Sequence, residues 1–227
     1  MDIINWIISI LLLGILGFFI GKFIKHKSLY PFMPFRYNFK RRRNTFKKTL
    51  ELLSQTKAQT IIETGTSREG LKGAKSNGAA TLVFGKWARE NNAELHSVDI
   101  SQKSVDVAQQ WVEKCNLTEN VQVHLSDSVA FLEKFDNKVD LLYLDSFDYT
   151  PDRAMQIASQ EHHLKEFIAI QDKLHKDTIV LIDDCKLPGG GKGKMVIKYM
   201  QEQGWKILIE SYQVLLLHKD SMILQEQ

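Results

Sequence analysis

Acidic residues follow five short apolar runs of this 227-residue chain, each at the point where a buried strand would end. A strand end in a protein core has no packing need for a carboxylate. In open α/β sheets, ligands bind beyond the carboxyl ends of the strands. Acids along that edge predict a polar ligand with several hydroxyl or amino groups, alone or with a cation. The acids are Glu63, Asp99, Asp127, Asp145, Asp183 and Asp184.

The residues around the first three acids indicate a nucleotide-like ligand. Gly65 lies between two threonines in the sequence ETGTS and would allow the backbone to approach the ligand closely. Asp99 follows the second strand, where an acid commonly binds the hydroxyls of a ribose. Asp127 and Ser128 follow the third strand and suit the edge of an adenine.

The sequence lacks the motifs of two common nucleotide sites. An NAD site would have G-x-G-x-x-G in the first turn with an acid about 20 residues later, and a P-loop would have G-x-x-x-x-G-K-[ST]. The glycine-rich stretch GGGKGK at 189–194 has no Ser or Thr after it. We interpret that stretch as a flexible loop.

Asp145, Asp183 and Asp184 form a candidate metal site. They end the fourth and fifth strands, which are neighbours in this type of sheet, so their carboxylates would repel unless protonated or bridged by a cation. Oxygen ligands select a hard ion such as Mg²⁺, Ca²⁺ or Mn²⁺. The alternative is that Asp184 only caps the next loop and that no metal binds.

These residues also suggest how a substrate hydroxyl could be activated. A metal at Asp145 would lower the pKa of a bound hydroxyl and direct its oxygen. Without a metal, a general base is needed, and Asp148 and His163 are the candidates. Paired histidines in a helix such as EHHLKEF are more often packing residues than catalysts.

The elements that would position these residues alternate between helix and strand from Thr49 onward. This alternation predicts a Rossmann-like, doubly wound, mostly parallel sheet of seven strands. Only a few residues join the last two strands, so they form an antiparallel hairpin at one edge. The predicted strands are 60–62, 95–98, 121–124, 139–144, 178–182, 206–210 and 213–218.

The N-terminal segment predicts a membrane anchor over residues 1–27. Residues 3–24 are largely apolar and carry Lys22 as their only charge, and roughly 20 apolar residues cross a bilayer as a helix. Basic residues follow the apolar run and no cleavage site is recognisable, so we expect an uncleaved single span with a cytoplasmic domain.

Residues 28–48 are predicted to be a basic linker between the anchor and a domain of residues 49–227. The first 50 residues hold ten Lys or Arg and one acid, a net charge of +9, so the positive charge is concentrated here. The cluster Lys40 to Arg43 would lie near anionic lipid headgroups. Interleaved aromatic residues leave single-stranded nucleic acid as a rival, less favoured partner. The two cysteines form neither a disulfide framework nor a zinc motif, which indicates a reducing compartment.

The motifs, taken in order, resemble those of class I S-adenosylmethionine-dependent methyltransferases. They resemble most the branch that contains the methyltransferase 24, TylF and catechol O-methyltransferase-like enzymes. The resemblance covers about residues 58–219 and depends on order and spacing rather than on one motif. It is carried by ETGT (63–66), SVDIS (97–101), SDS (126–128), LDSFDY (144–149) and LIDD (181–184).

The resemblance implies a role for each residue of the site. Glu63, Gly65, Thr66 and Ser67 would line the methionine part of S-adenosylmethionine. Asp99 would bind the ribose, Ile100 would lie against the adenine, and Asp127 and Ser128 would meet its amino group. Gly78 and Thr81 would begin the next helix beside the cofactor. Asp145, Asp183 and Asp184 stand where catechol-type relatives bind Mg²⁺. The stretch REGLKGAKSN at 68–77 is an insertion relative to the family, either a lid or a solvated loop.

Together these features predict a membrane-anchored, S-adenosylmethionine-dependent O-methyltransferase. Its acceptor would be a small molecule, a glycan or a lipid-linked compound, and no nucleic acid is expected as partner. Two alternatives stay open: a membrane-tethered protein without catalytic activity, and an enzyme of the same architecture that uses NAD or a nucleotide sugar.

Overall fold

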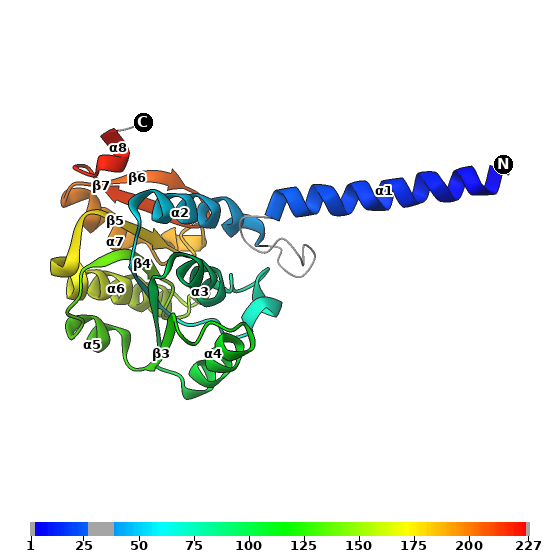
Figure 1. Cartoon of the computed structure of the whole chain (residues 1–227). Coiled ribbons are helices and arrows are strands. Elements are labelled where there is room, and N and C mark those ends of the chain that lie inside the picture. Colours follow the sequence, from blue (N-terminus) through cyan, green and yellow to red (C-terminus); the bar gives the residue numbers. More distant parts are fainter. Residues whose placement is uncertain (1–2, 27–38, 226–227) are drawn as a thin grey trace.

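The computed structural model of this protein describes residues 3–26 and 39–225, as one apolar helix and one α/β domain (Figure 1). The helix α1 (Ile3–His26) has 24 residues, which corresponds to about 36 Å at 1.5 Å per residue. Its segment Ile3–Lys22 is long and apolar enough to cross a membrane, and none of it is buried. The length and composition of α1 support the predicted apolar N-terminal helix. Both membrane anchors and signal sequences form helices of this kind.

A seven-stranded sheet forms the centre of the domain, in the order β3-β2-β1-β4-β5-β7-β6. The first five strands pair in parallel, whereas β7 is antiparallel to both β5 and β6. This confirms the predicted Rossmann-like sheet and its C-terminal hairpin. The strands are β1 (Thr60–Thr64), β2 (Glu94–Asp99), β3 (Val121–Leu125), β4 (Val139–Leu144), β5 (Leu174–Ile182), β6 (Trp205–Glu210) and β7 (Val214–His218).

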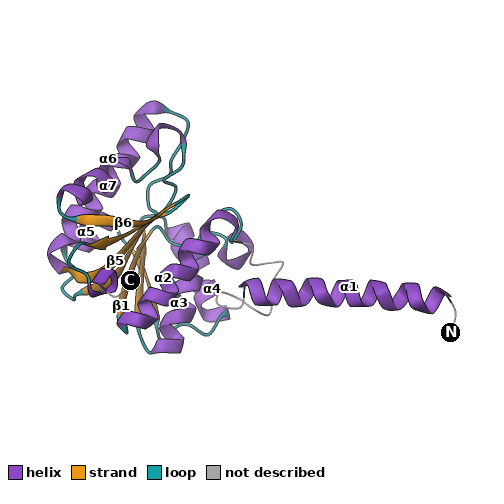
Figure 2. Ribbon diagram, turned by 90° about the horizontal axis from the view of Figure 1, so that it is seen from above, coloured by secondary structure: helices purple, strands orange, loops and turns teal. Residues whose placement is uncertain are grey.

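Helices cover both faces of the sheet, as the view along it shows (Figure 2). Successive residues of a strand point to opposite faces, so neighbours such as Ile61 and Ile62 belong to two different apolar cores. This explains why the central strands read as continuous apolar runs. The α-helices of the domain are α2 (Arg43–Thr56), α3 (Ala80–Asn91), α4 (Gln102–Lys114), α5 (Ser128–Glu133), α6 (Arg153–Ile170), α7 (Lys194–Glu202) and α8 (Met222–Gln225).

The described domain begins at Phe39, ten residues before the predicted start at Thr49. Phe39 is fully buried against Phe46 of α2, and Phe46 in turn packs edge-on against Phe84 of α3. The prediction of a basic linker is therefore wrong from Phe39 onward, while residues 28–38 lie outside the described residues. Arg42 of the predicted headgroup-binding cluster is also buried, so it faces the protein interior.

Candidate active site

Two adjoining cavities open at the carboxyl edge of the sheet, one of about 700 Å³ and one of about 290 Å³. Both are lined by the residues that follow β1, β2 and β4. This is the edge at which the acids predict a ligand. The residues that the two cavities share are Gly65, Asp99, Ile100, Ser146 and Phe147.

Gly65 lines both cavities. Its φ is +84°, and a Cβ atom built on it would lie 2.5 Å from the carbonyl oxygen of Asp145. The approach is this close because β1 and β4 are neighbouring parallel strands. The backbone N–H of Gly65 donates to the Val98 carbonyl on the other side, at 2.8 Å. Only glycine fits here, which leaves the edge of the sheet open to a ligand.

Asp99 lies at the end of β2, where backbone donors hold its carboxylate. Its Oδ1 accepts from the Ser101 N–H at 2.8 Å, and its Oδ2 accepts from the Thr66 N–H at 3.2 Å. Each carboxylate oxygen keeps a further lone pair for a hydroxyl donor. The neighbouring Ile100 is 73% exposed, which is unusual for an isoleucine. A flat apolar ligand that packs against Ile100 would bury this surface.

The smaller cavity also contains Asp127, Ser128 and His162. Asp127 caps α5 by accepting from the Ala130 N–H at 2.9 Å. His162 Nε2 lies 3.0 Å from Ser128 Oγ and 3.3 Å from the buried Glu166 Oε1. Burial alone would lower the pKa of His162, but the hydrogen bond to Glu166 raises it overall. Of the two adjacent histidines, His162 lines this cavity and His163 does not.

Four residues that the resemblance places at the cofactor lie behind the cavity wall instead. Glu63 is 1% exposed and accepts a 2.5 Å hydrogen bond from Ser97 Oγ; burial raises its pKa to about 7. Ser67 and Thr81 bind each other, with the Ser67 N–H 2.9 Å from Thr81 Oγ1. Gly78 packs against the Arg42 side chain. These residues shape the turn, while Gly65 and Thr66 line the cavity.

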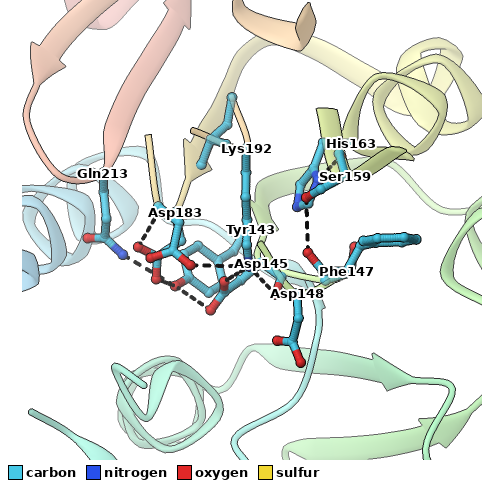
Figure 3. A network of polar contacts seen from close by, with 12 residues as sticks. Tyr143, Asp145, Phe147, Asp148, Ser159, His163, Asp183, Lys192 and Gln213 are labelled. Carbon is cyan, nitrogen blue, oxygen red and sulfur yellow. Dashed lines mark hydrogen bonds and ion pairs between the residues drawn. The ribbon is translucent and has the colours of Figure 1, made fainter. Parts of the chain in front are cut away.

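The three acids of the predicted metal site do converge, but with two cations of the chain among them. Figure 3 shows Asp145, Asp183 and Lys192 of this cluster. Lys192 Nζ lies 2.7 Å from Asp145 Oδ1 and 3.4 Å from Asp184 Oδ2. Arg42 Nε lies 2.6 Å from Asp183 Oδ2. No set of three or more His, Cys, Asp or Glu in the described part of the chain could hold a metal ion. The arrangement does not fit the predicted Mg²⁺ site, because the ammonium occupies its place.

Lys192 comes from the glycine-rich stretch that the sequence predicts to be a flexible loop. The backbone of this stretch is held in place, because Gln160 Nε2 donates to the carbonyls of Gly189 at 3.2 Å and Gly191 at 3.0 Å. Gly191 packs onto the Asp184 backbone with a φ of +62°, so no side chain fits there. The prediction is therefore wrong, and sequence reasoning missed Lys192. The only sign of Lys192 in the sequence was its position within a glycine-rich stretch shortly after Asp183 and Asp184.

The two predicted general bases are poorly placed for that task. Asp148 binds Arg68 with both carboxylate oxygens at 2.9 Å, and this hydrogen bonding lowers the pKa of Asp148. His163 is fully buried on α6, with Nδ1 2.7 Å from the Ser159 carbonyl; burial lowers its pKa to about 4. His163 does not line either cavity.

The insertion 68–77 is a packed part of the cavity wall rather than a solvated loop. It contains a short 3₁₀ helix, Gly70–Gly73, and Leu71 and Ala74 join the apolar core. Gly70 packs against the Trp111 ring of α4. On its other side, the insertion lines the larger cavity with Arg68 and Ser76, among others. Arg68 and its ion-pair partner Asp148 both line that cavity.

A comparison with protein families matches residues 75–185 to a family model described as a methyltransferase domain. No curated protein matches the chain by sequence.

Solved structures share the fold at low sequence identity. A Staphylococcus aureus protein described as a caffeoyl-CoA O-methyltransferase has a TM-score of 0.58 at 12% identity, over 77% of this chain and 83% of that one. The methyltransferase PaMTH1 of Podospora anserina, bound to S-adenosylhomocysteine, has a TM-score of 0.57 at 14% identity, over 89% and 88%. An O-methyltransferase from Bacillus cereus has a TM-score of 0.54 at 14% identity, over 78% and 81%.

The family match and the sheet order agree with the order of the motifs. The matched residues include β2 through β5 and most of the acids at the carboxyl edge of the sheet. Residues 75–185 are thus similar to a methyltransferase domain, and the α/β domain as a whole has a fold that solved methyltransferases share.

Proposed function

We propose that this chain transfers the methyl group of S-adenosylmethionine to an oxygen of an acceptor bound in the larger cavity. The observation that carries this proposal is the junction of the two cavities at Gly65 and Asp99. The smaller cavity suits an adenosine, and the larger one leaves room for an acceptor. The methyl group would then be transferred above Gly65, where the two spaces meet.

Residues of the chain would hold the cofactor along the carboxyl edge. Asp99 would accept from the ribose hydroxyls, and Ile100 and Phe147 would enclose the adenine. Ser128 and the cap residue Asp127 would contact the edge of the base. The backbone at Gly65 and Thr66 would bind the methionine part. Glu63, Ser67, Gly78 and Thr81 would act through the shape of the turn, since they do not line the cavities.

The reaction exchanges a carbon–sulfur bond for a carbon–oxygen bond and releases a proton from the acceptor hydroxyl. The bound cofactor supplies a methyl group that its sulfonium has already activated. Asp145 lines the larger cavity beside Gly65 and would accept the hydroxyl proton. Burial, opposed by the Lys192 ammonium, raises the pKa of Asp145 and makes it a better proton acceptor than an exposed aspartate. Positioning of the two reactants would supply much of the acceleration, up to about 7–11 kcal/mol.

The acceptor would be a hydroxyl-bearing compound at the membrane surface. Charged residues of both signs line the larger cavity, which suits a polar group such as a glycan or a lipid headgroup. The apolar helix α1 would anchor the chain with the domain in the cytoplasm. Thirteen chain steps from His26 to Phe39 span at most about 45 Å, so the cavity stays near the bilayer.

Asp99→Asn should weaken the binding of S-adenosylhomocysteine by about 10- to 100-fold, because hydrogen bonds to a charged group contribute about 1.5–3 kcal/mol. Calorimetry on the full chain in detergent measures this change. Asp106→Asn is the control, since Asp106 is exposed on α4, outside both cavities. Binding of NAD in place of S-adenosylhomocysteine would contradict the proposed cofactor.

The full chain should stay in the membrane pellet after alkaline carbonate extraction, with its N-terminus intact by mass spectrometry. A chain without residues 1–26 should be released, because it lacks the only described helix that is long and apolar enough to span a bilayer. An N-terminus cleaved after α1 would show that this helix is a signal sequence, and would overturn the anchor.

A further inference from the structure

The carboxylates at the ends of β4 and β5 are compensated from within the chain. Asp183 is fully buried, and both of its oxygens have partners. Its Oδ2 accepts from Arg42 Nε and from the Tyr143 hydroxyl, each at 2.6 Å, and its Oδ1 accepts from the Asp184 N–H at 2.7 Å. One of the three predicted metal ligands is therefore already committed to the protein interior.

The Lys192 ammonium lies between the other two carboxylates. Its side chain is only 3% exposed, and it contacts Asp145 through Oδ1 at 2.7 Å and through the backbone carbonyl at 3.2 Å. The longer contact, 3.4 Å, is to Asp184 Oδ2. The two contacts between Lys192 and Asp145 set the orientation of the Asp145 carboxylate. The third brings Asp184 into the same cluster.

Arg42 completes the cluster from a distant part of the chain. Its Nη2 lies 3.1 Å from Asp184 Oδ1, whereas Lys192 lies near Asp184 Oδ2. The two carboxylate oxygens of Asp184 therefore face different cations. Its Nη1 donates to the Ser76 carbonyl at 2.8 Å, and its guanidinium stacks on the Tyr212 ring at 4.8 Å. Two positive charges thus offset three negative ones within a largely buried region.

We propose that this methyltransferase works without a divalent metal, and that Lys192 is a positioning residue which holds Asp145 in place of the ion. The role of Asp145 rests on the proposed function, whereas the charge compensation does not. Close carboxylates require a cation among them, and an ammonium is a compact charge with three donors that meets this need. A divalent ion could enter only by displacing Lys192, because it would otherwise lie beside another positive charge.

A titration with Mn²⁺ alone tests this on the full chain in detergent micelles, with the free-ion signal followed by electron paramagnetic resonance. The wild-type chain should show no saturable binding. Lys192→Ala should gain a Mn²⁺ site, with affinity higher by about tenfold or more, since it leaves Asp145 and Asp184 facing an empty space. Lys192→Arg keeps the positive charge and should exclude the ion. Lys186→Ala, an exposed lysine of the same connection, should behave as wild type.

Three results would overturn the proposal: saturable Mn²⁺ binding by the wild-type chain, the same binding by Lys192→Arg, or a folded Lys192→Ala variant that gains no site. If Lys192→Ala does not fold, the wild-type and Lys192→Arg titrations still decide, because either one binding Mn²⁺ contradicts the exclusion. The readout requires neither cofactor nor acceptor. A failure to bind S-adenosylhomocysteine would therefore count against the proposed function alone.

Discussion

Arg42→Ala should destabilise the domain by about 3–5 kcal/mol, because it removes one partner of a buried ion pair and leaves Asp183 charged in the protein interior. The pair is close, with Arg42 Nε 2.6 Å from Asp183 Oδ2, and the two side chains are 7% and 0% exposed. The substitution also removes the contacts of Arg42 with Asp184 and with the Ser76 carbonyl. Urea unfolding followed by circular dichroism measures the change in the free energy of unfolding.

Lys47→Ala, five residues further along in helix α2, is the matched control. Its ion pair with Glu51 is exposed at 3.7 Å, and such pairs contribute less than about 0.5 kcal/mol. A loss below about 1 kcal/mol in Arg42→Ala would show that the buried pair does not hold the N-terminal segment to the sheet. For the same reason, a chain that begins at Thr49 should not fold, since it lacks Phe39, Arg42 and Phe46.

Glu63→Gln should change the pH dependence of stability rather than cofactor binding. Burial raises the pKa of Glu63 to about 7, from an ordinary value of 4.5, and the hydrogen bond from Ser97 opposes this rise. The folded chain therefore keeps the Glu63 proton up to about pH 7, whereas the unfolded chain releases it near pH 4.5. Unfolding releases a proton within that window, so wild-type stability falls as the pH rises through it.

The glutamine variant has no such proton to release. Its stability relative to wild type should increase by about 3 kcal/mol between about pH 4 and pH 8, at 1.36 kcal/mol per pKa unit. Thermal and urea unfolding across this range measure the difference. Glu133→Gln, on the exposed side of α5, should show no comparable trend. A flat profile for Glu63→Gln would mean that the Glu63 carboxylate is solvated or contacts a cation.

Local patterns were sufficient to predict the sheet and its hairpin. The apolar runs mark strands because their side chains are buried on both faces, and few residues between β6 and β7 permit only an antiparallel turn. The acids at the strand ends also predict the correct edge, since parallel strands bring their carboxyl ends together.

The start of the domain was not predictable in this way. Basic residues next to an apolar helix read as a linker, although Phe39 and Phe46 are buried.

The sequence by itself determined the fold class, the edge that carries the site, and residues such as Gly65 and Asp99 that line it. Tertiary structure alone decided which charges meet there. Arg42 reaches Asp183 across 141 positions, and Lys192 reaches Asp145 across 47. Such pairings depend on which strands become neighbours and on how a loop folds back. The rotation of α6 likewise places His162, and not His163, in the cavity. Adjacent helical residues point about 100° apart, so only one of the two side chains can face it. Sequence periodicity does not tell which, because the two neighbours are of the same type.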